Sequence, residues 1–259
     1  MADKFSKEEK IISDLLQSLG EWSQEIVIGG GYALLIYRLF LTPEREPMPA
    51  ATRDIDSLIP RSVGKGKEQL AKILQQAGFQ HQFKDGENPP TESYQKEMEG
   101  EDIELEFLTD DRVRKDRGVN VKISGIVAQP LSYLEMSLSE VCDFETKTGQ
   151  KGKVVSPAAW AFHKALTFPR RHNDAKQKKD LYGIWFVLSQ LGKLSEEAET
   201  EFMRLQTENP SWAKTAKKNL VQLKDWSPID WETLEEQDPA GLLTKQRFIA
   251  NLTKAQLLG

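Results

Sequence analysis

The feature that most constrains the fold is a run of three glycines, Gly29, Gly30 and Gly31, that separates an apolar segment from a helix-forming one. Residues 26–28 are apolar and β-branched, which predicts a buried strand, whereas the apolar spacing over 32–40 predicts a helix. Glycine at such a turn adopts positive φ and lets backbone N–H groups approach another group closely. The N–H groups at the first turn of a helix also bind anions. The run therefore predicts a strand–turn–helix unit, with an anion site or a tight packing contact at the turn.

A pair of aspartates follows the glycine run. Asp54 and Asp56 stand two apart in an apolar segment, 54–59, which predicts a strand within a sheet. Side chains two apart share one face of a strand, so the two carboxylates lie together. Carboxylates held side by side in a sheet need a cation or a basic partner. The pair therefore predicts a Mg²⁺ site at which phosphate oxygens complete the ligands of the metal.

A second acidic pair lies further along the chain. Glu104 and Glu106 alternate with apolar residues over 103–108, which predicts a strand that presents both carboxylates on one face. Glu106, or Glu104 as an alternative, would complete a set of three carboxylates with the aspartate pair. Such a set holds two Mg²⁺ ions, one that lowers the pKa of an acceptor hydroxyl and one that binds triphosphate oxygens. The pattern therefore predicts displacement at the α-phosphorus of a nucleoside triphosphate.

Two better-known glycine motifs do not fit. A dinucleotide-binding fingerprint requires a third glycine where this chain has Leu34. Its doubly wound fold also requires a regular alternation of strands and helices, which the sequence lacks. A Walker A loop requires Gly-Lys followed by Ser or Thr, and these residues do not follow the glycines.

The character of the chain changes at Ser156. Ser156-Pro157 predicts the start of a helix, because serine caps the first turn and proline is favoured at the first helical position. We predict an α+β domain over 1–155, with a mixed β-sheet flanked by helices, and a helical domain over 156–259. In the first domain we expect helices over 6–19, 32–40 and 67–76, strands over 26–28, 54–59, 79–83, 103–108, 119–123 and 126–128, and a turn over 85–90. In the second we expect helices over 158–167, 175–191, 195–206, 211–223 and 241–258.

Composition excludes several classes of protein. Hydrophobic residues make up 39% of the 259, which is enough for packed cores without disulfide bonds. Cys142 is the only cysteine, so no intrachain disulfide forms and a cytoplasmic location is expected. No apolar stretch predicts a signal peptide or a membrane span. The net charge of −5 disfavours non-specific coating of nucleic acid, although a local basic patch can still bind a polyanion.

The strand and glycine turn, Thr52-Arg53-Asp54-Ile55-Asp56 and the strand over 103–108 resemble the DNA polymerase β type nucleotidyltransferase superfamily. The resemblance covers about the first 130 residues. Within the superfamily the chain looks closest to the minimal, AbiEii-like nucleotidyltransferases. Their helical half carries a Lys, an Arg and a Lys-Asp-Leu motif, which Lys164, Arg171 and Lys179-Asp180-Leu181 resemble.

The resemblance implies Mg²⁺-dependent transfer of a nucleoside monophosphate from a nucleoside triphosphate to a hydroxyl group, with release of pyrophosphate. The acceptor would be RNA such as tRNA, a protein or a small molecule, and a toxin-like role would add an antitoxin partner. The implied metal ligands are Asp54, Asp56 and Glu106. The implied nucleotide-binding residues are Gly29, Gly30, Gly31, Arg53, Lys164, Arg171 and Lys179, the last three on a helical domain that closes the nucleotide cleft.

The last three residues belong to the densest basic segment of the chain, 163–180. A charge cluster of this kind is often only a solvated surface. The alternative is that Lys164, Arg171 and Lys179 neutralise the triphosphate and the departing pyrophosphate. In that case Arg170, Lys176 and Lys178 are left to meet an RNA acceptor.

The chain departs from the family pattern in three places, one of which is the absence of the second Asp that the helical motif often carries near Gly183. Gly31 stands where a small hydroxyl residue is usual, and the third carboxylate is commonly Asp rather than Glu. Two further functions therefore stay open: a nucleotide-binding module without catalysis, and a nucleotidyltransferase that modifies a small molecule of the aminoglycoside kind. An acidic acceptor pocket would distinguish the second.

Overall fold

The computed structural model describes residues 6–50, 52–63, 67–84, 91–111, 119–171 and 173–258. The predicted turn over 85–90 lies outside these residues. The chain forms two compact units. The first comprises Met1–Ala33 and Ala51–Val155, and the second comprises Leu34–Ala50 and Ser156–Gly259.

A nine-stranded sheet forms the centre of the first unit. Its main path runs in the order β3-β4-β5-β2-β1-β9-β8, and β7 pairs with β5 and β6. The strands are β1 (Val27–Ile28), β2 (Asp54–Leu58), β3 (Gln80–Phe83), β4 (Glu92–Met98), β5 (Glu101–Asp110), β6 (Val121–Ile123), β7 (Ile126–Leu131), β8 (Val141–Glu145) and β9 (Lys151–Val155). The pairs β2–β5, β1–β9 and β5–β7 are parallel and the other pairs are antiparallel. The mixed sheet expected from the sequence is confirmed.

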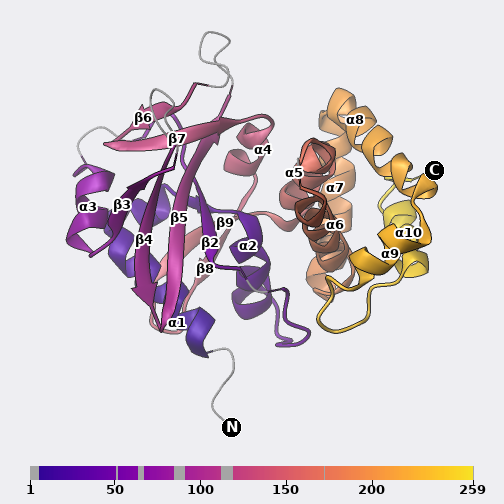
Figure 1. The fold of residues 1–259 in the computed structure, drawn as a ribbon, viewed down its shortest axis with the longest axis horizontal. Helices are drawn as coiled ribbons and strands as arrows, with labels where there is room; N and C mark the ends of the chain where they lie inside the picture. The colour runs from indigo at the N-terminus through magenta and orange to yellow at the C-terminus, as the bar shows by residue number, and fades with distance from the viewer. Residues whose placement is uncertain are drawn as a thin grey trace. The chain divides into compact units, whose positions relative to one another are not determined.

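Helices cover the apolar side of this sheet. The first unit contains α1 (Ser6–Leu19), α3 (Leu70–Gln76) and α4 (Leu134–Ser139), and α2 (Gly30–Ile36) begins in it. Figure 1 shows α1 passing behind β4 and β5, and α1 packs against α3. Ile12 and Leu15 of α1 are fully buried, as are Ile55 of β2 and Leu105 of β5. The helical spacing of α1 and the strand alternation of β5 therefore bury one continuous core.

The second unit is helical (Figure 1). Its helices are α5 (Pro157–Thr167), α6 (Asp174–Ser189), α7 (Lys193–Glu208), α8 (Pro210–Val221), α9 (Pro228–Glu235) and α10 (Lys245–Lys254). Ser156 caps α5 as predicted, since its Oγ accepts a hydrogen bond from Ala159 N at 3.3 Å. α6 packs against α5, α7, α9 and α10, so its second half is buried on all sides. Trp185 and Phe186 of α6 accordingly belong to the core.

Residues 34–50 belong to the second compact unit, although the sequence groups them with the first. The buried guanidinium of Arg38 explains this placement. It donates hydrogen bonds to the carbonyl oxygens of Pro47 at 2.9 Å and Glu44 at 3.2 Å, and to that of Gln190. Ala50 N also donates to the Tyr182 hydroxyl at 3.3 Å. These contacts tie the proline-rich loop to the helical unit, and the domain limits 1–155 and 156–259 stay a prediction.

Five of the described helices and strands escaped the sequence-based predictions: β4, α4, β8, β9 and α9. β4 reads Glu-Ser-Tyr-Gln-Lys-Glu-Met, which lacks an apolar alternation, and it forms because β3 and β5 pair with it on both sides. α9 did carry a signal, because Ser227 and Asp230 form a capping box around Pro228. The helix predicted over 241–258 is shorter than expected and begins at Lys245, where Thr244 caps it.

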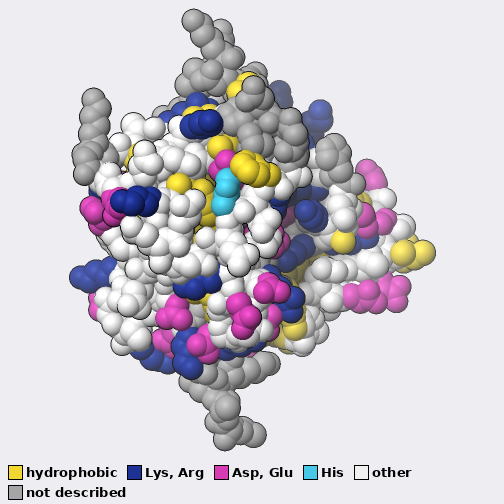
Figure 2. Space-filling model, turned by 60° about the vertical axis from the view of Figure 1, so that its left-hand side comes forward, with side chains coloured by type: hydrophobic (Ala, Val, Ile, Leu, Met, Phe, Trp, Pro, Cys, Tyr) yellow, Lys and Arg dark blue, Asp and Glu magenta, His cyan; other side chains and the backbone are white. Residues whose placement is uncertain are grey.

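The described surface carries charges of both signs. On the face drawn in Figure 2, Lys and Arg side chains are intermingled with Asp and Glu side chains. Within the described ranges, every helix is too short or too polar to cross a lipid bilayer.

Candidate active site on the sheet

Four carboxylates lie on one face of the first unit's sheet. β2 and β5 run parallel, with Asp54 opposite Glu104 and Asp56 opposite Glu106. Adjacent strands are about 4.8 Å apart, so the aspartate pair and the glutamate pair are neighbours. Asp54 is exposed and the other three side chains are partly exposed. The structure thus brings together the acidic residues that the sequence singled out on two separate strands.

The glycine turn packs directly against β2. A Cβ at Gly29 would lie 2.5 Å from Leu58 Cδ1, and one at Gly31 would lie 2.8 Å from Thr52 Cγ2. A Cβ at Gly30 would lie 2.8 Å from Asp56 Cγ and closer still to its Oδ2. Gly29 N also donates a hydrogen bond to the Asp56 carbonyl at 2.8 Å. The tight packing contact, one of two alternatives for this turn, is therefore present, and it places the turn against the Asp56 carboxylate.

The sequence did not predict a role for Lys84, which follows β3. Its Nζ forms an ion pair with Glu104 Oε1 at 2.8 Å and a second one with Glu106 Oε1. Burial alone would lower the pKa of Lys84, but its hydrogen bonds with both glutamates outweigh burial and raise it. Burial likewise raises the pKa of Glu104, but the hydrogen bonds from Lys84, Ser93 and Gln95 and the charge of Lys84 together outweigh burial and lower it. One lysine therefore bridges both glutamates of β5.

The fit of Mg²⁺ differs between the two acidic pairs. Mg²⁺ is commonly held by one or two carboxylates, with substrate phosphates and water as its other ligands. Asp54 and Asp56 fit that description. In the part of the chain that the structure describes, no three His, Cys, Asp or Glu side chains are grouped closely enough to hold a metal ion. The set of three carboxylates therefore stays a prediction, and Lys84 forms ion pairs with both candidates for its third member, Glu106 and Glu104.

Arg53 contacts a different acid. Its Nη2 atom lies 2.9 Å from Glu101 Oε2, and Lys7 Nζ donates a hydrogen bond to the same carboxylate. The Arg53 side chain is 69% exposed, so this pair contributes little to stability. Arg53 is therefore adjacent to Asp54 in the sequence, but its guanidinium forms an ion pair with Glu101.

In the second unit, Asp180 binds two of the cations singled out in the sequence. Lys164 Nζ lies 2.8 Å from Asp180 Oδ1, and Arg171 Nε lies 2.9 Å from Asp180 Oδ2. Burial raises the pKa of Asp180, but the two cations outweigh burial and lower it. Asp180 thus fixes Lys164, which is buried, and Arg171, which is exposed.

The remaining cations of the basic segment differ in exposure. Lys179 is exposed. Lys178, which was expected to meet RNA, is only 6% exposed and pairs with Asp174 at 2.7 Å, so that expectation is wrong. It lies on the buried side of α6, where it also approaches the ring of Trp226.

Comparisons with known proteins concern the family and the fold of the chain. Residues 8–205 match the model of the family described as "Nucleotidyltransferase". No curated protein matches the chain. The structure is similar to that of a proposed nucleotidyltransferase from H. pylori, with a TM-score of 0.50 and 12% identity over 99% of this chain and 95% of that one. It is also similar to an antigenic nucleotidyltransferase-like protein from Paracoccidioides brasiliensis, with a TM-score of 0.44 and 18% identity over 82% of this chain and 92% of that one.

Proposed function

The chain belongs to the nucleotidyltransferase family, whose model matches residues 8–205, and we propose that it transfers a nucleoside monophosphate from a nucleoside triphosphate to a hydroxyl group. One observation carries the placement of the site: Asp54 and Asp56 share a face of β2, and the glycine turn packs against Asp56. The pair lies next to the glutamates of β5, so the acidic residues form one surface.

The reaction makes one bond and breaks one. The oxygen of the acceptor hydroxyl bonds to the α-phosphorus, the bond to the bridging oxygen of the β-phosphate breaks, and pyrophosphate leaves. Asp54 and Asp56 would hold Mg²⁺, which when bound supplies positive charge to the phosphates and lowers the pKa of the acceptor hydroxyl. The glycine turn packs against the Asp56 carboxylate, and its three glycines remain our candidates for contacts with the phosphates.

Glu106 remains our candidate for a third carboxylate, with Glu104 as the alternative. Both are paired with Lys84. We infer that Lys84 limits how many metal ions this face binds, because its ammonium group already occupies the space between the two glutamates. One Mg²⁺ at the aspartate pair is the arrangement that this ion pair favours.

The family resemblance supports a second set of contacts. Lys164, Arg171 and Lys179 would neutralise the triphosphate and the leaving pyrophosphate. Asp180 would act as a positioning residue for the first two, since its carboxylate oxygens bind one cation each.

Radiolabelled transfer tests this proposal. The purified protein is incubated with each α-³²P-labelled nucleoside triphosphate, Mg²⁺ and cellular RNA, beside Asp54→Ala/Asp56→Ala. Asp143→Ala is a matched control, because Asp143 is an exposed strand aspartate of the same unit. We expect label on an acceptor, lost in the double variant and kept in the control. Full transfer by the double variant would refute the mechanism.

One observation favours a second candidate function, nucleotide binding without transfer. In the described residues no group of three metal-ligating side chains converges, and Lys84 neutralises part of the acidic face. Binding of a fluorescent nucleoside triphosphate with no pyrophosphate release, with every acceptor tried, would support this function over transfer.

The resemblance to AbiEii-like proteins carries one further element, a toxin-like role with an antitoxin partner. Expression of the chain in a bacterial host tests it. We expect growth arrest that Asp54→Ala/Asp56→Ala abolishes, and normal growth with full expression would exclude this role in that host.

A further inference from the structure

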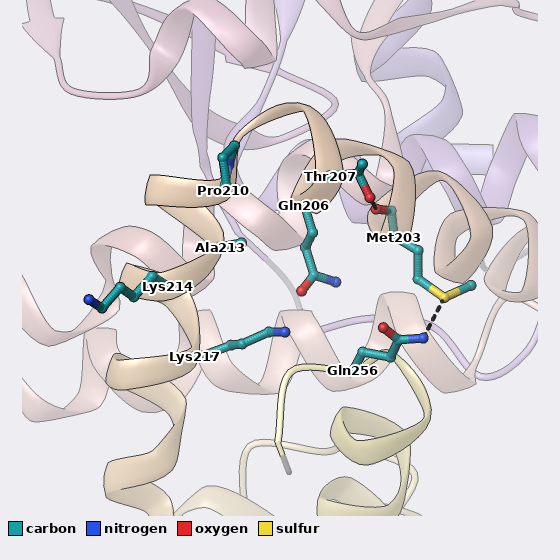
Figure 3. Close-up of a pocket in the computed structure, with 8 residues that line it drawn as sticks. All are labelled: Met203, Gln206, Thr207, Pro210, Ala213, Lys214, Lys217 and Gln256. Atoms are coloured by element: carbon teal, nitrogen blue, oxygen red, sulfur yellow. Dashed lines mark hydrogen bonds between the residues drawn. The ribbon is translucent and has the colours of Figure 1, made fainter.

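The helical unit contains a cavity that the reaction described above does not use. It has a volume of about 630 Å³ and is lined by residues of α7, residues of α8 and Gln256 (Figure 3). Cavities of about 300–1,000 Å³ are typical of small-molecule and cofactor sites. The cavity is therefore large enough to admit a nucleotide.

Polar side chains converge on this space. Figure 3 shows the Lys217 ammonium group and the carboxamides of Gln206 and Gln256 directed into it. Gln206 Nε2 donates to the Ala255 carbonyl at 3.1 Å, and Gln256 Nε2 donates to Met203 Sδ at 3.4 Å. These bonds fix both amide groups with their carbonyl oxygens available to a ligand. A cation and two amide oxygens suit a ligand that carries both a negative charge and N–H donors.

The charge of α8 identifies the anionic part of that ligand. Lys214, Lys217 and Lys218 lie within α8, which has no acidic residue over Pro210–Val221. Among the residues with described positions, no ion pair involves any of the three lysines. Side chains three and four apart on a helix are neighbours, so these cations repel one another until an anion binds. This local excess of positive charge contrasts with the net charge of −5 of the whole chain.

The arrangement of the lysines favours a ligand with several phosphates in a row over a ligand with a single phosphate group. Lys217 points into the cavity, whereas Lys214, which also lines it, extends outward from α8 (Figure 3). The positive charge therefore continues beyond the cavity. The fixed carboxamides of Gln206 and Gln256 can in turn hydrogen-bond the edge of an unpaired base, which is how proteins read single-stranded RNA.

We propose that this cavity and the lysines of α8 bind the acceptor, and that the acceptor is a single-stranded polynucleotide. The phosphates would lie along Lys214 and Lys217, and one base would enter the cavity beside Gln206 and Gln256. The proposal rests on the proposed function, because it names the acceptor class of the same reaction. It gives the helical unit a role separate from metal binding.

Fluorescence anisotropy with a labelled single-stranded oligoribonucleotide tests the site, over a series of salt concentrations. The variant is Lys214→Ala/Lys217→Ala. Each phosphate neutralised contributes about 0.7 to the slope of log affinity against log salt for single strands, so loss of two contacts should reduce the slope by about 1.4. We expect at least a tenfold loss of affinity at low salt. Alanine is a better helix former than lysine, so α8 should persist, and circular dichroism checks this.

A matched control removes the same charge elsewhere in the same unit. Lys193→Ala/Lys245→Ala serves this purpose, because Lys193 is 88% exposed on α7 and Lys245 begins α10, both outside the cavity. This control should keep the wild-type slope. Equal loss in both double variants would indicate non-specific charge and would overturn the site.

The catalytically impaired Asp54→Ala/Asp56→Ala protein separates the two proposals. If it binds the oligoribonucleotide with wild-type affinity, the acceptor site stands even where no transfer is detected. The site is overturned if wild-type protein does not bind the oligoribonucleotide, or if Lys214→Ala/Lys217→Ala binds it equally well. Binding of free nucleoside triphosphate or inorganic phosphate that depends on Lys217, without oligoribonucleotide binding, would assign the cavity to a small anion and also overturn the proposal.

Discussion

The packing of Gly30 against Asp56 allows a test that separates backbone strain from displacement of a catalytic carboxylate. In Gly30→Ala, the new Cβ would lie 2.8 Å from Asp56 Cγ. Carbon atoms pack at about 3.5–4.0 Å, so the carboxylate must move by roughly 1 Å. A misplacement of about 1 Å at a reacting centre costs roughly a hundredfold in rate. We therefore expect kcat to fall by about that factor.

Gly20 supplies the control, because it has nearly the same φ angle as Gly30 without the clash. The φ angles are +56° at Gly30 and +55° at Gly20, and a Cβ at Gly20 would meet no atom within 4 Å. A non-glycine residue in this left-handed region costs about 1–2 kcal/mol. Gly20→Ala should thus lose that stability, which lowers Tm by about 2–4 °C per kcal/mol, and keep its activity.

The assay is radiolabelled nucleotide transfer together with thermal unfolding of both variants. We expect similar losses of Tm, with the loss of activity confined to Gly30→Ala. Equal activities in the two variants would refute the reasoning, because the position of Asp56 would then not matter for transfer. A much larger loss of Tm in Gly30→Ala than in Gly20→Ala would instead show that the clash destabilises the fold around the turn.

Three further substitutions have expected outcomes. Lys84→Met should lower the Mg²⁺ concentration for half-maximal activity by about 3–10-fold, because an ion pair of this exposure is worth about 1 kcal/mol. The control Lys72→Met, at an exposed ion pair with Glu68, should leave that concentration unchanged. An unchanged Mg²⁺ requirement in Lys84→Met would contradict the role of Lys84. Asp180→Asn should destabilise the protein in urea by about 3 kcal/mol, since it leaves the buried Lys164 unpaired, whereas Glu208→Gln at the exposed pair with Arg204 should cost less than about 1 kcal/mol. The pKa of Asp180 lies below its ordinary value of 3.8, so the ionised carboxylate stabilises the protein fully above that pH. The difference in free energy of unfolding between wild type and Asp180→Asn should therefore shrink as the pH falls through the lowered pKa. A difference that stays constant into acid would argue against the ion pairs. Gly183→Ala should cost about 1–3 kcal/mol by overpacking, because its Cβ would lie 2.8 Å from Trp160 Cζ3, and an unchanged unfolding midpoint would show that Trp160 moves aside.

Local chemistry made much of the acidic face predictable. The period of two along 103–108 was sufficient to place Glu104 and Glu106 on one face, and the spacing of Asp54 and Asp56 was sufficient for β2. The adjacency of these two strands is a non-local property. The two pairs were joined only by the chemistry of a shared metal site and by the family resemblance, because about 50 residues separate the paired positions and no periodicity encodes such pairing.

Lys84 was not predictable for the same reason. Its partners lie on β5, and β4 stands between β3 and β5 in the sheet. β4 is polar, with Gln95 and Glu97 among its residues, so its sequence gave no strand signal. Without β4 the position of β3 in the sheet, and hence of the lysine that follows it, could not be derived.

The helical unit shows a similar limit. The basic segment could be recognised from composition, but which cations are buried depends on packing. Lys178 and Lys179 are adjacent in sequence, yet one is buried and the other exposed, because neighbouring residues of a helix point in directions about 100° apart. The packing of α6 against α5 and α9 determines which of the two lysines a ligand can reach.

The distribution of charge on the sheet indicates where a cation is needed. Glu104 and Glu106 share Lys84, whereas Arg53 is directed to Glu101. Both glutamates of β5 thus have a lysine partner, whereas in the described part of the chain no ion pair neutralises Asp54 of β2. A divalent ion that bound by charge alone would therefore settle beside β2. It follows that Asp54→Asn should weaken Mg²⁺ binding far more than Glu104→Gln, measured by isothermal titration in the presence of a non-hydrolysable nucleoside triphosphate. If Glu104→Gln weakened binding as much, Lys84 would have to leave the glutamates when metal binds, and the face would hold the two ions that three carboxylates allow.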